Sequence, residues 1–483
     1  MSIIIPANSA VGGGIEGNSC RFNDGSSDYL NRTNVSSVTN NQKFTLSQWV
    51  KRGALGTTQR LYGMADNSPG TYAQEIYSID AANTITYQHR IAGSDVSYKS
   101  TTNMLFRDVG AWYHIVLAVD TTQGTDTNRV KIYVNGTQVS TTQGGYPSTA
   151  YIPQNNPVWF NYASLVNQLG ALAGNSTFDG YMAEVVMIDG TQLAPTSFGQ
   201  FNGDSGVWQP IDVSGLTFGN NGFYLDFEDS SALGNDAAGS NNWTTNNLTA
   251  IDQTTDSPTN NFATLNSIDN YYAGGTFSEG NLQVISVNTG YTYNTSTFGG
   301  ATGKWYWEVK WSAQPTGSTN QVQIGIAKRV AASATTWLGS QAYTYGYQGS
   351  SGHVQVSDGN ASGSVATTYA IGDIISVAMD LDNNKIHFAK NGTYTNSSDP
   401  AANSGGVTIT APDSTSGDSG FYFAAFGDGN NSLQETGQFN FGAGPPYAIS
   451  SGNADGNGYG NFEYAPPSGF LSLCTANLSE VNS

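Results

Sequence analysis

The sequence predicts an all-β chain of two jelly-roll type antiparallel β-sandwiches joined by a polar connector. In residues 304–311, Trp305, Trp307, Val309 and Trp311 alternate with polar side chains, so one face of this strand is broad and apolar. Only a second sheet packed against it can hide such a face. Charged residues make up 11% of the chain, against about 25% in ordinary globular proteins, and 58 glycines accompany many β-formers.

The first half of the chain is a series of strand-length segments bounded by Gly, Pro, Asn or Asp. Residues 112–120 are almost continuously apolar, which indicates a strand buried on both faces or central in its sheet. In residues 129–139, an alternating strand ends at Asn135-Gly136, which predicts a two-residue hairpin turn. Further strands are expected within residues 21–33, 44–52, 61–65, 73–79, 84–90 and 178–188.

The second half shows the same kind of pattern. Residues 321–327 alternate again, and residues 384–393 end in a second hairpin signal, Asn391-Gly392. Other core strands are expected in residues 371–380, 421–426 and 439–441. Between the halves, residues 229–261 are nearly all small and polar, but Trp243 indicates that they lie on a domain. We therefore expect sandwiches in residues 1–203 and 263–483, with a connector packed on them in residues 204–262.

Charge and cysteine usage exclude several classes of function. The net charge is −19 without a basic stripe, which disfavours binding to nucleic acid or to an anionic membrane surface. No segment approaches ~20 apolar residues, so we expect no membrane insertion, and the first six residues do not resemble a signal peptide. Cys20 and Cys474, the only cysteines, are expected to be buried thiols rather than a long-range disulfide.

The sequence offers no catalytic residues. Its four histidines, His89, His114, His353 and His387, have no metal-binding spacing, so a zinc site is not expected. A glycoside hydrolase needs two carboxylates facing one cleft. Asp226/Glu228 have a suitable spacing but lie at the edge of the connector, while Glu184/Asp189 are five residues apart and fall on opposite strand faces. We therefore predict that the chain is not an enzyme and needs no cofactor.

Two sets of residues are candidate binding groups. Tyr343, Tyr345, Tyr347 and His353 fall in a glycine-rich stretch, where exposed aromatic rings would contact a sugar or a protein. The alternative is an ordinary loop that covers the end of the sandwich. Calcium is left open, because Asp80, Asp120, Asp126 and Asp179 could supply oxygen ligands, although aspartates in turns more often cap local amides.

Each half resembles a known domain family. Residues 110–120, 131–136 and 178–184 resemble the laminin-G/concanavalin A-like lectin family, which implies a jelly-roll of two antiparallel sheets. Residues 303–308, 324–326, 372–373, 380–382 and 388–392 resemble the SPRY (B30.2-like) domain. That resemblance implies a compact β-sandwich that binds partners through loops on one rim.

The whole chain also resembles a family of tailed-bacteriophage virion proteins, through residues 22–33, 49–52, 222–227, 241–246, 256–261 and 464–470. This resemblance implies a tail fibre, tail-tip or head-surface component, made in the host cytoplasm and exposed on the virion surface. Our first hypothesis is a non-enzymatic adhesin that binds host surface glycan or protein through sandwich loops. A purely structural decoration protein is the alternative, and a glycan depolymerase is disfavoured. Other virion proteins and a homo-oligomer are the expected partners.

Overall fold

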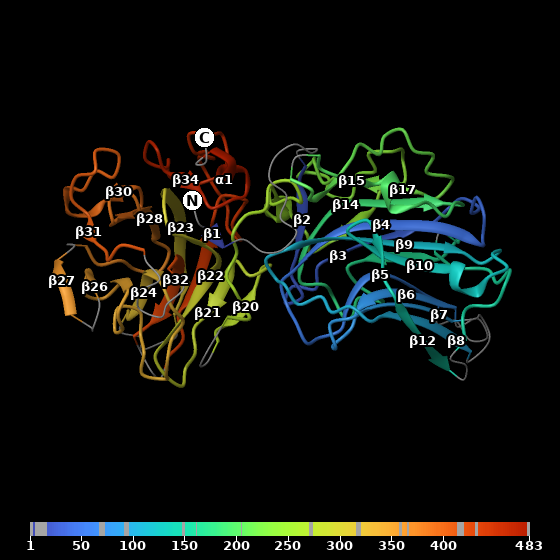
Figure 1. Ribbon diagram of the computed structural model, residues 1–483, viewed down its shortest axis with the longest axis horizontal. Coiled ribbons are helices and arrows are strands. Elements are labelled where there is room, and N and C mark those ends of the chain that lie inside the picture. The colour runs from blue at the N-terminus through green and yellow to red at the C-terminus, as the bar shows by residue number, and fades with distance from the viewer. Residues whose placement is uncertain are drawn as a thin grey trace. The chain divides into compact units, whose positions relative to one another are not determined.

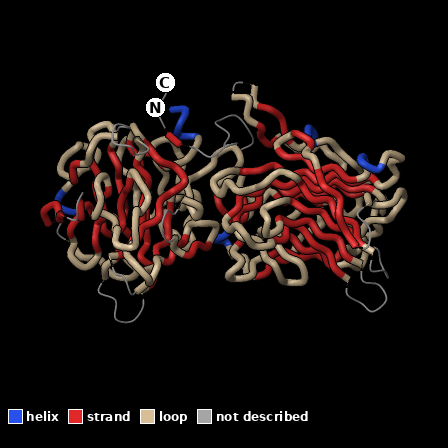
Figure 2. The backbone as a smooth tube through the Cα atoms, turned by 60° about the horizontal axis from the view of Figure 1, so that its bottom comes forward, coloured by secondary structure: helices blue, strands red, loops and turns tan. Residues whose placement is uncertain are grey.

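The computed structural model describes the backbone of Ile3–Ile4 and residues 17–66, 73–90, 96–146, 150–160, 162–203, 205–269, 274–314, 320–356, 360–364, 367–412, 420–429 and 433–480. The chain forms two compact units: the first is Gly13–Thr259, and the second is Asn260–Ser483 together with Met1–Gly12. Strands are the main regular structure of each unit, and the helices are short (Figures 1 and 2). Within the described residues, no helix is long and apolar enough to span a membrane.

The first unit is a sandwich of two antiparallel sheets. One sheet has the order β11 (Thr137–Gln138), β10 (Val130–Val134), β9 (Trp112–Asp120), β4 (Lys43–Arg52), β14 (Gly180–Asp189), β2 (Ser19–Phe22) and β19 (Gln253–Thr254), with β17 (Phe223–Leu225) paired to β14. The other has the order β12 (Thr141–Tyr146), β8 (Ser97–Thr102), β7 (Ile85–Arg90), β6 (Gln74–Ile79), β5 (Gln59–Ala65), β13 (Val166–Leu169), β3 (Tyr29–Thr33) and β18 (Thr244–Asn246). A hairpin, β15 (Gly199–Phe201) and β16 (Trp208–Pro210), and the 3-10 turns η1 (Asp126–Asn128), η2 (Pro195–Ser197) and η3 (Ala250–Asp252) complete it.

The second unit repeats this two-sheet architecture. Its first sheet has the order β1 (Ile3–Ile4), β22 (Thr292–Gly300), β32 (Tyr422–Asp428), β24 (Val322–Ala327), β25 (Thr344–Gln348), β26 (His353–Val356) and β27 (Asn360–Ser364). Its second has the order β20 (Thr276–Ser278), β21 (Gln283–Ile285), β33 (Thr436–Asn440), β23 (Lys304–Ala313), β28 (Ile374–Asp380), β29 (Lys385–Lys390) and β30 (Thr393–Tyr394), with β31 (Val407–Thr408) on β29 and β34 (Leu471–Ser472) parallel to β23. The turn η4 (Thr395–Ser397) and the helix α1 (Ala476–Glu480) complete this unit.

The predicted all-β fold is confirmed, and the tryptophan-rich strand β23 lies inside the second sheet with its alternation intact. Trp305, Trp307 and Trp311 are buried in the core between the two sheets. The middle of the opposite face is also buried, because residues 459–472 cover it: Tyr306 is 1% exposed and Glu308 is fully buried, while Lys304 and Lys310 at its ends stay partly exposed. Glu308 accepts hydrogen bonds from the backbone N–H groups of Glu463 (3.0 Å) and Tyr464 (2.7 Å). A period of two therefore identified the core face, but a polar face does not by itself mean exposure to solvent.

The unit boundaries differ from the expected ones at both ends of the first sandwich. Residues 204–259 are not a connector between domains, because β17 pairs with β14, β18 with β3 and β19 with β2, all inside the first unit. Phe223, Leu225 and Phe227 enter its core, which explains why this polar stretch folds there. At the N-terminus, β1 pairs with β22 of the second unit, with Ile3 opposite Gly300.

A buried ion pair fixes the end of the first unit to the outer face of its sheet. Lys51 Nζ lies 2.6 Å from Asp256 Oδ2, and the two side chains are 0% and 1% exposed. Trp112 Nε1 donates to Asp256 Oδ1 at 3.0 Å, and Ser19 Oγ donates to the carbonyl oxygen of Asp256 at 2.6 Å. Charged groups removed from water are tolerated only when partners surround them. The ion pair and the hydrogen bonds to Asp256 must therefore be made as the unit folds.

Glu184 lies at a bulge in β14, where the pairing with β4 shifts between Ala183 and Val186. Its φ of +49° is unusual for a residue other than glycine, and Tyr224 Oη donates to its Oε2 at 2.6 Å. Burial raises the pKa of Glu184 to about 7; the Tyr224 hydrogen bond opposes this rise and the nearby Asp226 carboxylate adds to it. The folded protein therefore holds a proton that an unfolded glutamate, with its ordinary pKa of 4.5, releases at lower pH.

We predict that Asp256→Ala destabilises the first unit by about 3–5 kcal/mol, because it leaves the Lys51 charge buried without its carboxylate. Calorimetric or urea unfolding of the whole chain measures the change. Asp24→Ala removes an exposed carboxylate of the same unit and should cost less than about 0.5 kcal/mol. Equal effects of the two substitutions would show that the buried pair does not stabilise the unit.

We also predict that Glu184 makes the first unit less stable as pH rises from about 4.5 to 7. Over this window the folded state binds more protons than the unfolded state, so the unfolding free energy declines, by roughly 3 kcal/mol in total. Glu184→Gln removes this contribution. The unfolding free energy of the variant should therefore rise relative to that of the parent between about pH 4.5 and 7, and urea unfolding at several pH values measures this difference. Asp24→Asn is the control. A constant difference between Glu184→Gln and the parent at every pH would refute the prediction.

Candidate functional site

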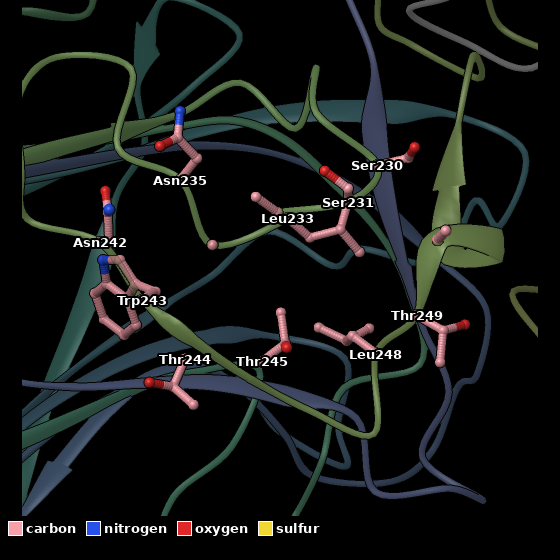
Figure 3. A pocket seen from close by; sticks show the side chains of 13 residues that line it. Ser230, Ser231, Leu233, Asn235, Asn242, Trp243, Thr244, Thr245, Leu248 and Thr249 are labelled. Carbon is pink, nitrogen blue, oxygen red and sulfur yellow. The ribbon is translucent and has the colours of Figure 1, made fainter.

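The first unit has a hollow of about 420 Å³ beside β18 (Figure 3). We call it the serine–threonine hollow. Residues 230–235 form one wall and residues 242–250 the other. The lining residues are Ser230, Ser231, Ala232, Leu233, Gly234, Asn235, Asn242, Trp243, Thr244, Thr245, Leu248, Thr249 and Ala250.

Aromatic packing fixes the base of this hollow. The ring of Trp243 meets Phe223 edge-on at 4.9 Å and Tyr62 at 5.9 Å, and all three side chains belong to the sandwich core. Leu233 and Leu248 join the same core. Trp243 N–H donates to the Gly234 carbonyl at 2.7 Å, and the two backbones are so close that a Cβ at position 234 would lie 2.0 Å from the Trp243 oxygen. The walls are therefore held rigidly although their sequence is polar and low in complexity.

The chemistry of the hollow is that of hydroxyl and amide groups. Ser231, Thr244, Thr245 and Thr249 contribute hydroxyls, and Asn235 contributes an amide. Two of these hydroxyls already donate to nearby carboxylates, Ser231 to Asp229 and Thr249 to Asp252. None of the lining residues carries an ionisable side chain. Such groups both donate and accept hydrogen bonds, which suits a neutral ligand rich in hydroxyls. They provide no general acid, general base or charged anchor.

Neither of the candidate carboxylate pairs, Asp226/Glu228 and Glu184/Asp189, lines this hollow. Asp189 Oδ2 accepts hydrogen bonds from Thr39 N and Thr39 Oγ1, both at 2.9 Å, and so holds a loop. Glu184 instead lies close to Asp226, across the pairing of β14 with β17. Sequence spacing missed this proximity because it joins residues of two strands that are far apart in the chain.

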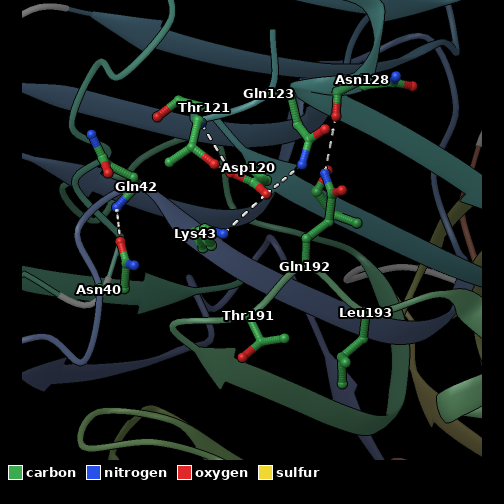
Figure 4. Close-up of polar contacts among 12 residues, drawn as sticks. Asn40, Gln42, Lys43, Asp120, Thr121, Gln123, Asn128, Thr191, Gln192 and Leu193 are labelled. Atoms are coloured by element: carbon green, nitrogen blue, oxygen red, sulfur yellow. Dashed lines mark hydrogen bonds and ion pairs between the residues drawn. The ribbon is translucent and has the colours of Figure 1, made fainter. Parts of the chain in front are cut away.

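Asp120, one of the candidate calcium ligands, stabilises a turn at the end of β9 (Figure 4). It accepts from Thr122 N and Oγ1 and from Gln123 Nε2, and Lys43 Nζ lies 3.2 Å from its Oδ2. Burial acts to raise the pKa of Asp120, but these hydrogen bonds and Lys43 outweigh it and lower the pKa below its usual value. The carboxylate is thus occupied by local partners.

The other three candidate calcium ligands also contact nearby backbone groups. Asp80 accepts from Ala82 N, Thr84 N and Thr84 Oγ1, as expected of a residue that caps a turn. Asp126 is exposed and bonds to the next backbone N–H, and Asp179 is buried with its carboxylate packed on Gly53. Among the described residues, no three or more His, Cys, Asp or Glu side chains are grouped to hold a metal ion.

The predicted tyrosine loop is in fact the two strands β25 and β26. Tyr345 is 4% exposed and Tyr347 is fully buried, and both belong to the core of the second unit. Tyr343 is partly buried, with Lys328 Nζ 4.5 Å from its ring centroid, and His353 is half-buried on β26. Tyr345 and Tyr347 are therefore not exposed, whereas Tyr343 and His353 keep part of their surface, and ligand binding at these four residues stays a prediction. Glycine between the tyrosines suggested a loop, but their spacing of two is also that of a strand with one buried face.

His114 is a structural histidine, as its position inside a strand predicted. Its ring stacks on Trp49 at 4.7 Å and on Trp208 at 5.9 Å. Trp208 Nε1 donates to its Nδ1 at 2.9 Å, and Ser47 Oγ lies 2.8 Å from its Nε2. Burial lowers the pKa of His114 to about 3, so the ring is neutral. Cys20 and Cys474 are free and buried, as predicted.

Comparisons with known proteins agree with this architecture. Residues 24–194 match the family model of the concanavalin A-like lectin/glucanases superfamily, and residues 304–443 match that of the SPRY domain. No curated protein matches the chain.

Several solved structures are similar at low identity. The SPRY domain of human HERC1 is 13% identical, and the match covers 33% of this chain and 87% of that one, with a TM-score of 0.26. A heptameric SAP-like pentraxin from Limulus polyphemus is 13% identical, covering 38% and 80% of the two chains, with a TM-score of 0.28. Domain 4 of the arabinanase AbnA from Geobacillus stearothermophilus, in complex with arabinotriose, is 20% identical, covering 33% and 64%, with a TM-score of 0.23. By its two family models, the chain contains an N-terminal laminin G-like, concanavalin A-like domain and a C-terminal SPRY domain.

Proposed function

We propose that this chain is a non-enzymatic surface protein of a tailed-phage virion that binds a neutral host glycan through the serine–threonine hollow. The observation that carries the proposal is the hollow itself: about 420 Å³ in a lectin-like unit, lined by hydroxyls and amides over a rigid base. Its volume falls in the range of about 300–1,000 Å³ that is usual for small-molecule sites.

The charge of the chain favours a neutral ligand over an anionic one. With a net charge of −19, the protein repels acidic polysaccharides at long range, and the lining residues include no Lys or Arg to reverse this locally. A sugar hydroxyl can exchange donor and acceptor roles with Thr and Asn side chains, and the apolar ring faces of a sugar suit the Leu and Trp base.

The virion assignment is supported by the resemblance of six stretches along the whole chain to phage virion proteins. Two of them take part in the architecture described above: residues 256–261 contain the buried Asp256, and residues 464–470 lie over strand β23. As a tail fibre, tail-tip or head-surface component, the protein would be made in the host cytoplasm, form a homo-oligomer and contact other virion proteins.

We predict that Thr245→Trp lowers the affinity for the bound glycan at least tenfold, because Thr245 is exposed within the hollow and an indole there would fill it. A glycan array identifies the ligand, and titration calorimetry measures the loss. Thr125→Trp, at an exposed turn of the same unit, is the matched control and should bind like the parent. Equal binding by parent and Thr245→Trp would place the glycan site elsewhere.

Host adsorption separates this function from its alternatives. Purified protein should bind host cells, and Thr245→Trp should bind them more weakly. A protein that coats the particle but binds neither cells nor glycans would be a structural decoration protein. Release of reducing sugar from host polysaccharide would contradict the non-enzymatic assignment.

A further inference from the structure

The second unit has a separate hollow of about 230 Å³ on the outer face of its first sheet. We call it the glutamine hollow, since Gln321, Gln323, Gln348 and Gln355 line it together with Tyr291 and Trp337. Gln323 of β24 and Gln348 of β25 are direct cross-strand partners. Their neighbours Val322, Ile324 and Tyr347 point the other way, into the core. The alternation that buries the predicted tyrosines therefore places the glutamines on the opposite face.

Hydrogen bonds orient three of the four glutamine amides. Gln348 Nε2 donates to Gln321 Oε1, and Gln355 Nε2 donates to Gln348 Oε1 at 3.3 Å. Gln321 Nε2 donates in turn to Ser350 Oγ at 3.3 Å. The amides thus form a connected network along one side of the hollow, with their positions fixed before any ligand arrives.

Gln323 differs from the other three. Its side chain lines the hollow and is 1% exposed, and its Oε1 is buried without a hydrogen-bond partner. A buried acceptor left unpaired costs about 1–3 kcal/mol, so such a group in a native protein calls for an explanation. A ligand hydroxyl donated to this oxygen would provide one.

Two aromatic rings form the other side of the hollow. Tyr291 and Trp337 meet edge-to-face, with centroids 5.5 Å apart and an interplanar angle of 66°, and both remain partly exposed. The loop that carries Trp337 is anchored, because Tyr291 N donates to the Ala334 carbonyl at 2.7 Å and Ser340 Oγ donates to the Trp337 carbonyl at 2.7 Å. The rings are therefore fixed beside the amides.

We propose that the glutamine hollow is a second glycan-binding site, which takes a single neutral sugar ring. Amides that donate and accept match sugar hydroxyls, and fixed aromatic rings match the C–H face of a pyranose. The lining residues include no Asp, Glu, His, Lys or Arg, so the site provides no charged anchor for a charged ligand. The small volume favours one ring over an extended peptide. This site goes beyond the serine–threonine hollow and does not depend on it.

The test uses the full chain and a panel of neutral monosaccharides and disaccharides, with saturation-transfer NMR and titration calorimetry. All variants are made in the parent and in the Thr245→Trp background, where the first hollow is blocked. Trp337→Ala should weaken sugar binding at least tenfold in the blocked background. Gln323→Met should do the same and should leave the melting temperature unchanged or higher, because it removes an unpaired buried acceptor.

Gln438→Met is the matched control, since Gln438 lies on β33 of the other sheet, away from the hollow, and should bind sugar like its parent. The proposal is overturned if sugar binding in the blocked background is absent or survives both Trp337→Ala and Gln323→Met. It is equally overturned if a peptide library binds at this hollow and the sugars do not. Normal binding by Thr245→Trp together with loss in Gln323→Met would reject the first site and keep this one.

Discussion

In both units, one buried carboxylate on the outer face of a central sheet holds the trailing part of the unit in place. Asp256 binds Lys51 and Trp112 in the first unit, and Glu308 binds the backbone N–H groups of Glu463 and Tyr464 in the second. A carboxylate withdrawn from water is stable only if donors surround it, so strand and trailing segment must come together at once. The trailing segment that each carboxylate holds covers the outer face of the sheet that contains β4 or β23. That sheet is then covered on both faces, by the other sheet and by the trailing segment.

Neither hollow lies on the sheet that carries the buried carboxylate: the serine–threonine hollow borders β18 and the glutamine hollow borders β24 and β25, each in the other sheet of its unit. The residues that form the serine–threonine hollow lead along the chain to Asp256. The segment that Asp256 fixes to the sheet therefore also positions the walls of the hollow. The glutamine hollow lies on the other kind of sheet, whose outer face is covered only in part: Leu338 packs there with Ala327 and Ala425. Beyond that cluster Gln321, Gln348 and Gln355 stay partly exposed, while Gln323 is buried at the base of the hollow. Each site is thus built on a rigid sheet and finished by a loop, which is the usual arrangement for binding sites.

Both hollows share one chemistry. Hydroxyls and amides line them, no Asp, Glu, His, Lys or Arg is among the lining residues, and apolar or aromatic groups provide a fixed surface. On a chain of net charge −19, this combination suits the neutral, hydroxyl-rich ligands that we propose for both hollows. Small open sites of this kind bind weakly one at a time, and the two sites we propose on one chain would together raise the affinity for a surface that carries many copies of the ligand.

The sequence by itself determined the features that depend on residues close together in the chain, namely individual strands and tight turns. Alternation in residues 304–311 set the strand and its core face, and Asn135-Gly136 and Asn391-Gly392 set two hairpin turns, since all four residues adopt positive φ. Only the tertiary structure decided which segments pair across long stretches of chain, so that residues 204–259 complete the first unit and β1 joins the second. It also decided that Tyr345 and Tyr347 are buried while Gln323 lines a hollow, because the side of a strand that faces the core depends on which sheet packs against it.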